Sequence, residues 1–251
     1  MKTKDKILEI LLKQKEAYIS GESLAESLEI SRNAVWKAIN ALKEEGYCIQ
    51  GVKNKGYRLV DDNDILSVQA VRAFLPNELS DIPVEIYREL ESTNRTAKET
   101  AIAGLVHGQT IIAGSQTGGK AHSGQAFFSP EGGLYMSVIL DPRRLPVQKP
   151  AHISAYGAAC VCQAIEKLSG TPCSIRLITD IFQNQEKVCG ILTESAFDFE
   201  TGDLQWIVVG IGICALAKSK RNEYAASILS HLLDTTIKEE NILEYYKNHH
   251  E

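Results

Sequence analysis

Residues 31–59 read SRNAVWKAINALKEEGYCIQGVKNKGYRL, and this stretch decides how the N-terminal part of the chain folds. Ser31 is a favourable N-cap because its hydroxyl can accept a hydrogen bond from an otherwise exposed helix amide. Gly46 is typical of the residue that ends a helix, and residues 47–60 read as two short strands around a turn. Between them, apolar side chains recur at the spacing of a single helical face, at Val35, Ile39 and Leu42. The stretch therefore predicts a helix followed by a β-hairpin.

Two shorter helical patterns precede this stretch. Apolar residues between positions 4 and 15 form a helical stripe, and residues 23–28 form a second, short helix. Three helices followed by a basic hairpin are the winged form of the helix-turn-helix, whose third helix can reach base edges and whose hairpin can grip phosphates. We therefore expect this domain to bind a double-stranded DNA operator. The DNA-binding residues that we expect are Ser31, Arg32, Asn33, Trp36, Lys37, Lys53 and Lys55.

Charge is distributed unevenly along the chain. Residues 1–60 hold 11 Lys and Arg against 8 Asp and Glu, whereas the rest holds 16 against 24, and the whole chain has a formal net charge of −5. A basic head on an acidic body suits a protein whose head contacts a polyanion. Because the basic excess is modest, a three-helix protein-interaction module is the alternative. The acidic run at 61–64 predicts a linker between a first domain, 1–62, and a second, 63–251.

Composition excludes several classes of protein. Hydrophobic residues make up 44% and charged residues 24% of the 251, as in an ordinary soluble globular protein. No apolar run approaches the ~18–20 residues that cross a bilayer, and the amphipathic N-terminus lacks the apolar core of a signal peptide. We therefore expect a cytoplasmic protein with no membrane partner. The six cysteines form no CxxC pair and lack zinc spacing with histidines, which predicts buried, reduced thiols and no metal site.

Helices and strands alternate from about residue 66 onwards. Helical patterns cover 67–76, 92–104, 151–168 and 223–247. Runs rich in Val, Ile and Leu read as strands: VEIYREL, QTIIAGSQT, GLYMSVIL, SIRLITDIF, KVCGILTESAF and QWIVVGIGI. Helices interleaved with buried strands indicate a layered α/β domain. The whole chain is therefore predicted to be α+β, with a winged helix-turn-helix followed by an α/β domain.

Four short segments of the second domain carry candidate chemistry. The polar cap at 92–94 follows a strand, and the Gly-rich loop at 116–120 lets backbone amides approach an anion. Lys187 opens an otherwise buried strand, and the two glycines of the segment 210–212 remove side chains, which makes room for a ligand. Each segment also has a structural explanation: a capping box, a hairpin, an edge lysine and a β-bulge.

Together and in this order, these segments match one family. The runs ESTN, SQTGG, SPEGGLYMSVIL, KVCGILTE and VVGIGI, with residues 31–59, resemble the bifunctional biotin protein ligases, or biotin operon repressors. The resemblance covers nearly the whole chain and implies a class II synthetase-like, biotin/lipoate ligase-type α/β domain behind the winged helix-turn-helix. In that family the domain joins biotin to ATP to make biotinyl-5′-AMP and then passes biotin to a lysine of a carrier protein. The adenylate-loaded form dimerises and represses biotin genes.

The resemblance also implies site residues. Hydroxyl, amide and backbone donors suit a ureido group, and glycines and aliphatic walls suit the apolar ring and chain of biotin. The implied biotin-binding residues are Ser92, Thr93, Asn94, Gln116, Gly119, Lys120, Lys187, Gly190 and Gly212. Lys187 is also the implied catalytic residue, if the chain is active. The implied nucleotide-binding residues are His122, Phe127, Arg176 and Asp180, and ATP and Mg²⁺ are needed only for catalysis.

The sequence departs from the family on the nucleotide side. The family's phosphate loop, GRGRxGR, reads GKAHSGQ at 119–125, so three arginines become Lys, His and Gln. The family's KWPND reads RLITD at 176–180, and its GIGIN ends here in Cys214. The tryptophan expected after the loop is Phe127. We also expect no counterpart of the family's small C-terminal β-barrel in this sequence.

These departures remove fixed cations from the place where adenylation develops negative charge. Losing one such donor typically costs ~10²–10³ in rate, and an arginine is not replaced in kind by a lysine, a histidine or a glutamine. We therefore expect a ligand-responsive repressor that binds biotin or biotinyl-5′-AMP and has weak or no ligase activity.

Two alternatives stay open. A working bifunctional ligase, which would also engage a carrier protein, is supported by the retained charged residues Lys120, Arg176, Asp180 and Lys187. A regulator with a changed small-carboxylate ligand is the other, with His122 and Cys214 as new specificity elements. A homodimer is expected by family resemblance, because winged-helix repressors usually read paired half-sites.

Overall fold

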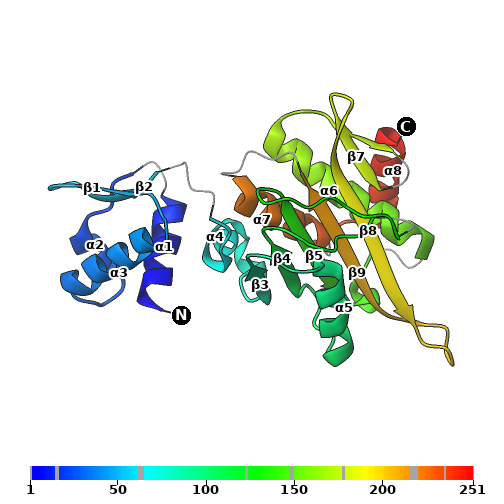
Figure 1. Ribbon diagram of the computed structural model, residues 1–251, viewed down its shortest axis with the longest axis horizontal. Coiled ribbons are helices and arrows are strands. Elements are labelled where there is room, and N and C mark those ends of the chain that lie inside the picture. Colours follow the sequence, from blue (N-terminus) through cyan, green and yellow to red (C-terminus); the bar gives the residue numbers. More distant parts are fainter. Residues whose placement is uncertain are drawn as a thin grey trace. The chain divides into compact units, whose positions relative to one another are not determined.

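The fold is described by a computed structural model that covers residues 2–14, 17–60, 65–121, 124–146, 150–176, 179–214, 220–234 and 236–250 (Figure 1). It divides into two compact units. Unit 1 comprises Met1–Phe74 with Lys218–Asn222, and unit 2 comprises Leu75–Ala217 with Glu223–Glu251. The first division of the chain therefore falls after Phe74, later than the boundary at 62/63 that the acidic run predicts.

Unit 1 has the three helices and the hairpin that the sequence predicts. The helices are α1 (Thr3–Lys13), α2 (Gly21–Ser27) and α3 (Arg32–Glu44), and β1 (Ile49–Val52) pairs antiparallel with β2 (Gly56–Leu59). Ser31 Oγ accepts a hydrogen bond from the Ala34 amide at 3.1 Å, as an N-cap does. Gly56 has a φ of +107°, and a Cβ there would lie 2.0 Å from the carbonyl oxygen of Ile19. The hairpin therefore requires glycine at this position.

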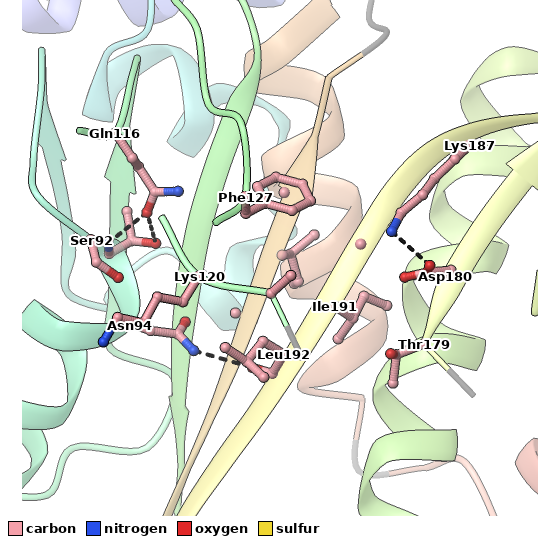
Figure 2. Close-up of a pocket in the computed structure, with 16 residues that line it drawn as sticks. Ser92, Asn94, Gln116, Lys120, Phe127, Thr179, Asp180, Lys187, Ile191 and Leu192 are labelled. Carbon is pink, nitrogen blue, oxygen red and sulfur yellow. Dashed lines mark hydrogen bonds and ion pairs between the residues drawn. The ribbon is translucent and has the colours of Figure 1, made fainter. Parts of the chain in front are cut away.

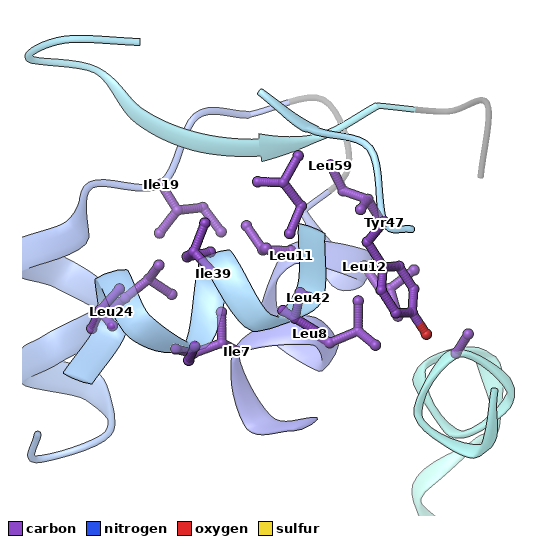
Figure 3. Packing of buried hydrophobic residues seen from close by; sticks show 14 of the residues in the cluster. Ile7, Leu8, Leu11, Leu12, Ile19, Leu24, Ile39, Leu42, Tyr47 and Leu59 are labelled. Atoms are coloured by element: carbon purple, nitrogen blue, oxygen red, sulfur yellow. The ribbon is translucent and has the colours of Figure 1, made fainter. Parts of the chain in front are cut away.

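Figure 3 shows the apolar core of unit 1. Ile7, Leu11, Ile39 and Leu42 are all buried in it, so the apolar faces of α1 and α3 meet as the sequence spacing predicts. A further helix, α4 (Val68–Phe74), packs against α1 and adds Ala70 to the same cluster. This packing moves the boundary beyond the acidic run, because α4 buries its apolar face in unit 1.

Unit 2 is built on a mixed sheet, seven-stranded within the described residues, in the order β3-β4-β5-β9-β8-β7-β6. β3 and β4 are parallel, and the other described neighbours are antiparallel. The strands are β3 (Val84–Tyr87), β4 (Thr110–Ala113), β5 (Leu134–Leu140), β6 (Ser174–Arg176), β7 (Asp180–Gln183), β8 (Glu186–Phe197) and β9 (Leu204–Ile213).

Helices cover both faces of this sheet (Figure 1). Val208 of β9 packs in the apolar cluster of α5, whereas its neighbour Val209 lies against Gly157 of α6. Because successive residues of a strand face opposite sides, α5 and α6 lie on opposite faces. The helices are α5 (Thr93–Ala103), α6 (Pro150–Ser169), α7 (Arg221–Leu232) and α8 (Glu239–His249), with 3₁₀ turns at Asn77–Leu79 and Pro142–Arg144.

Two predicted elements differ from the structure. The run SIRLITDIF, expected as one strand, contributes to two strands, β6 and β7, and Arg176 of β6 pairs antiparallel with Asp180 of β7. The expected helix 223–247 is two helices, α7 and α8. A turn separates them, in which Asp234 Oδ1 accepts from the Thr236 amide at 2.8 Å.

The expectation of buried, reduced thiols holds for only part of the cysteines. All six are free, but Cys48 and Cys214 are exposed, whereas the other four are buried. Cys48 lies between the buried residues Tyr47 and Ile49 and faces away from the core. Cys214 directly follows the last residue of β9. Among the described helices, none has the length and apolar character needed to cross a membrane.

Candidate functional site

A cavity opens in unit 2 over β8 and β9, on the face that α5 covers (Figure 2). The first turn of α5, the loop after β4 and the start of β7 form its other borders. The structure brings ten of the predicted residues together in its lining: Ser92, Thr93, Asn94, Gln116, Lys120, Phe127, Asp180, Lys187, Gly190 and Gly212. Thr179, Ile191 and Leu192 add further lining that the sequence did not single out.

Two of the described predicted residues, Gly119 and Arg176, are not among those that line the cavity. A Cβ at Gly119 would lie 2.7 Å from Ser129 Oγ, so this glycine lets the loop pack closely. Arg176 Nη2 donates to Gln185 Oε1 at 2.8 Å, and its guanidinium stacks over the Phe182 ring at 4.6 Å. His122 lies outside the described residues.

One wall of the cavity is a network of amides and hydroxyls, which we call the amide wall: Ser92, Thr93, Asn94 and Gln116 (Figure 2). Gln116 Oε1 accepts from the amide of Thr93 at 2.8 Å and from its hydroxyl at 3.1 Å. Asn94 Nδ2 donates to the Leu192 carbonyl at 3.2 Å and to Glu194 Oε2 at 2.8 Å. These bonds fix the side chains before any ligand arrives, which is how a site keeps its specificity.

Ser137 of β5 supports the amide wall and is not among the residues predicted from the sequence. Its side chain is fully buried, and Oγ lies 2.6 Å from Asn94 Oδ1 and 2.8 Å from Thr93 Oγ1. A signal was present, because Ser137 is a polar residue inside the apolar run LYMSVIL. Buried hydroxyls are normally hydrogen-bonded, so a serine in a buried strand indicates a partner on the facing helix.

The glycines of β8 and β9 accommodate protein side chains. A Cβ at Gly212 would lie 2.3 Å from Phe127 Cε1, and one at Gly190, its register partner, 2.9 Å from Phe127 Cε2. A Cβ at Gly210 would lie 1.9 Å from Asn94 Oδ1. The room that the glycines were expected to leave for a ligand is therefore occupied by the Phe127 ring and the Asn94 amide. The remaining cavity is small, about 50 Å³.

The opposite wall carries charge, and we call Asp180 and Lys187 the charged wall (Figure 2). Lys187 Nζ lies 2.6 Å from Asp180 Oδ2. The pair is partly open to solvent, so its Coulomb energy is screened. Lys120 is exposed in the loop, where it pairs with Ala126. Among the described lining residues, the cations are thus two lysines, one of them already paired with a carboxylate.

Cys214, expected as a specificity element if the ligand has changed, does not line the cavity. Its Sγ donates to the Phe128 carbonyl at 3.7 Å. Desolvation raises the pKa of this thiol above its usual value, so Cys214 is a protonated thiol at neutral pH.

Unit 1 presents a second candidate site, on α3 and the hairpin. The seven predicted DNA-binding residues are all exposed: Ser31, Arg32, Asn33, Trp36, Lys37, Lys53 and Lys55. Trp36 is 54% exposed on α3. Arg32 and Lys53 line one groove between α3 and the hairpin, where Glu22 forms an ion pair with Arg32.

Comparison with protein families matches both units. Residues 3–58 match the HTH domain, and residues 86–213, about half the chain, match the biotin/lipoate A/B protein ligase family. The bifunctional ligase/repressor BirA of Bacillus subtilis (strain 168) is 35% identical over 208 residues, which are 82% of this chain and 63% of that protein. BirA of Escherichia coli (strain K12) is 29% identical over 195 residues, 77% of this chain and 58% of that protein. The chain thus spans less than two thirds of these relatives.

Solved structures share the fold of unit 2. The biotin protein ligase of Leishmania major in complex with biotinyl-5-AMP has a TM-score of 0.55 at 19% identity, over 67% of this chain and 81% of that chain. The biotin acetyl coenzyme A carboxylase synthetase of Helicobacter pylori with bound biotinylated ATP has a TM-score of 0.57 at 17% identity, over 66% and 80%. With a family model that matches half of its residues, the chain belongs to the biotin/lipoate A/B protein ligase family and carries a helix-turn-helix domain in front of its ligase-like domain.

Proposed function

We propose that this chain is a biotin-responsive, DNA-binding repressor whose ligase activity is weak or lost. The observation that carries the proposal is the contrast between the two walls of the cavity. The Thr93, Asn94 and Gln116 side chains of the amide wall are held by hydrogen bonds to one another, to Glu194 and to Ser137, whereas the charged wall offers Lys187 already paired with Asp180. Such a site suits recognition of a neutral polar head group better than activation of a triphosphate.

The ligand is biotin or biotinyl-5′-AMP. Hydroxyl and amide groups of the amide wall suit a ureido ring, and the aliphatic side chains of Ile191 and Leu192 suit the apolar part. Pockets for ligands of this size usually measure about 300–1,000 Å³, whereas the cavity holds about 50 Å³. The Phe127 ring must therefore leave the glycines before a bicyclic ligand enters.

Adenylation requires cations aimed at the α-phosphate and the leaving pyrophosphate. The loop at 119–125 supplies one guaranteed cation, Lys120, where the family's pattern has three arginines. ATP and Mg²⁺ would be needed for catalysis. Mg²⁺ is commonly held by one or two carboxylates together with substrate phosphates, but Asp180, the carboxylate of the described lining, is committed to Lys187. The described residues therefore do not fit a magnesium site.

The DNA operator is contacted by α3 and the hairpin. Asn33 and Lys37 on α3 suit base edges and phosphates, and Lys53 and Lys55 suit the backbone. The functional form is a homodimer that reads paired half-sites. Selection of bound sequences from a random duplex pool, with and without biotin, identifies the operator and the direction of the ligand effect. Pools that show no enrichment in either condition would argue for the protein-interaction module instead.

The deciding experiment is biotin binding measured by calorimetry with and without ATP and Mg²⁺, followed by product analysis in the presence of a carrier-protein domain. We expect biotin to bind, adenylate to accumulate slowly or not at all, and the carrier to stay unmodified. Rapid transfer of biotin to the carrier lysine would overturn the proposal. Selective binding of another carboxylate with no binding of biotin would instead establish a changed ligand.

A working bifunctional ligase is the second candidate. It is favoured by the 35% identity to a protein named a bifunctional ligase/repressor and by the retained Lys187 and Lys120 at the cavity. The same product analysis separates the two, because only the ligase converts biotin and ATP to biotinyl-5′-AMP with release of pyrophosphate.

A further inference from the structure

A cluster of metal-ligating side chains lies on the face of the sheet opposite the cavity, where α8 packs against α6 (Figure 1). Cys162 and Glu166 stand one turn apart on α6, and Cys173 comes just before β6. The two Sγ atoms and a carboxylate oxygen of Glu166 all lie within 4.8 Å of one another. His249, at the end of α8, has its Nε2 3.7 Å from Glu166 Oε1.

Neighbouring groups already orient these side chains. Glu166 Oε1 accepts from the Cys173 amide at 2.7 Å, and Oε2 accepts from the Tyr245 hydroxyl at 2.5 Å. His249 Nδ1 lies 2.9 Å from the Tyr245 carbonyl oxygen. A proton on Nδ1 donates to that carbonyl and leaves the Nε2 lone pair available. Histidines that bind metals are usually held in this way, with the second nitrogen donating to a carbonyl or a carboxylate.

Burial also suits a metal site. Cys162 is fully buried and Cys173 is 7% exposed, so the two sulfurs are protected from bulk solvent and oxidants. The Glu166 and His249 side chains retain 24% and 27% exposure, which leaves an entry path. Two cysteines, a histidine and a carboxylate form a donor set that zinc accepts in tetrahedral geometry and that magnesium and calcium do not favour.

We propose that this cluster binds one Zn²⁺ ion through Cys162 Sγ, Cys173 Sγ, the Glu166 carboxylate and His249 Nε2. Cys162 Sγ, Cys173 Sγ and the Glu166 carboxylate already form a group within 4.8 Å. Zn–S bonds of about 2.3 Å and Zn–N or Zn–O bonds of about 2.0–2.2 Å require the His249 ring, whose Nε2 approaches Glu166 but lies outside that group, to move toward the two sulfurs. Each thiol loses its proton on binding, so one ion displaces two protons. Four protein ligands close the coordination sphere, which makes the site structural.

The ion would connect α6 and the entry to β6, which follow one another closely in sequence, to the end of α8, which is distant from both. Cysteine spacing predicted no metal site because the ligands share no short motif. Cys162, Glu166 and Cys173 lie close together in sequence but not in a zinc-motif spacing, and packing of α8 on α6 supplies the fourth ligand. The site is independent of the proposed function, since none of its residues lines the ligand cavity.

The test is titration of the reduced, chelator-treated full chain with Co²⁺, a spectroscopic substitute for zinc. We expect saturation at one equivalent, a thiolate-to-cobalt charge-transfer band, visible bands typical of tetrahedral cobalt, and displacement by Zn²⁺. Metal analysis of protein purified without chelator should find zinc at about one ion per chain. Octahedral cobalt spectra without a thiolate band, or no saturable binding, would overturn the proposal.

Matched variants locate the ion. Cys162→Ser and Cys173→Ser should abolish the charge-transfer band and weaken Co²⁺ binding by at least ~100-fold, the upper end of the cost of losing an outer-shell partner. Cys160→Ser is the control, because Cys160 is equally buried on the same helix but its Sγ donates to the His231 carbonyl. His249→Ala should weaken binding at least ~10-fold, and His250→Ala should leave it unchanged.

Two further measurements keep the result interpretable. Glu166→Gln retains the thiols and tests the site if a cysteine variant fails to fold, with weaker Co²⁺ binding expected. A chelator should lower the Tm of the wild type but not that of Cys162→Ser. Mass spectrometry of the untreated protein distinguishes a Cys162–Cys173 disulfide, which would appear as a loss of two hydrogens and would refute the zinc site.

Discussion

The amide wall and the charged wall of the cavity differ in how they are supported. The amide wall rests on the sheet: Ser137, buried in β5, bonds to both Thr93 and Asn94. The charged wall is the ion pair of Asp180 and Lys187, open to solvent on one side. The proposed recognition wall is thus held by the folded core, whereas Lys187 and Asp180 are more open to solvent. Substitutions at an exposed segment cost little stability, so a domain of this kind can lose its chemistry and keep its ligand.

The strongest test of this contrast adds cations to the loop at 119–125, where the family's pattern has arginines. His122→Arg with Gln125→Arg should raise the rate of adenylate formation by ~10²-fold or more, because each fixed donor at a developing anion is worth about 10²–10³. The measurement is pyrophosphate release in the presence of biotin, ATP and Mg²⁺. Ile102→Arg is the control, because Ile102 is exposed on α5 and does not line the cavity. Equal rates in the double variant and the wild type would contradict the electrostatic explanation.

Breaking the support of the amide wall should have the next largest effect. Ser137→Ala leaves buried polar atoms of Thr93 and Asn94 without this partner, which costs about 1–3 kcal/mol. Urea unfolding measures the loss, and biotin affinity should fall in parallel. Ser195→Ala, at an exposed position of β8, should stay within about 0.5 kcal/mol of the wild type. If Ser137→Ala changed neither the free energy of unfolding nor the biotin affinity, Ser137 would not support the amide wall.

Removing the carboxylate of the charged wall should matter less. Asp180→Asn frees Lys187, so the affinity for anionic biotin should rise by an amount equivalent to ~1 kcal/mol or less. The gain should disappear at high salt, because exposed charges are screened. Calorimetry at two ionic strengths measures both effects, with Asp203→Asn as a control of equal charge change. A large loss of folding stability in Asp180→Asn would place this pair in the core instead.

The smallest expected effect concerns His107, which lies outside both walls of the cavity. A substitution there would change the pH dependence of folding without changing a residue of the ligand site. His107 Nδ1 accepts from the Asp141 amide at 3.1 Å, and burial, with Arg144 nearby, lowers the pKa of His107 below 6.5. The folded protein therefore holds the His107 ring in its neutral form. The contribution of this ring to the free energy of unfolding is fully present above pH 6.5 and is lost as the pH falls through the pKa that His107 has in the folded state. His107→Gln should make the free energy of unfolding, measured in urea, depend less on pH across this acid range. An unchanged pH dependence would show that His107 does not contribute to it.

Local sequence patterns predicted those helices and strands whose apolar residues recur at the spacing of a single buried face. Val35, Ile39 and Leu42 recur on one face of α3, and Ser31 caps it, so the helix follows from neighbours in sequence alone. Ten of the residues that line the cavity were also predicted, because they lie in short motifs whose order along the chain matches one family. The Phe127 ring over Gly190 and Gly212 could not be anticipated, since it depends on how a loop folds back across two strands. The cluster at Cys162 and Cys173 was not predicted either, because it depends on how α8 packs against α6.

Under the proposed function, the placement of Phe127 has a consequence for the ligand concentration at which the protein would respond. A half-buried aromatic ring gains about 1–2 kcal/mol by leaving water, and an incoming molecule that displaces it forfeits that amount. Since 1.4 kcal/mol is tenfold in affinity, the ring moves the half-saturation point upward by roughly tenfold. A residue that forms no bond with the incoming molecule would thus set the threshold of the genetic response. Exchanging it for a smaller or larger side chain would adjust that threshold without altering what is recognised.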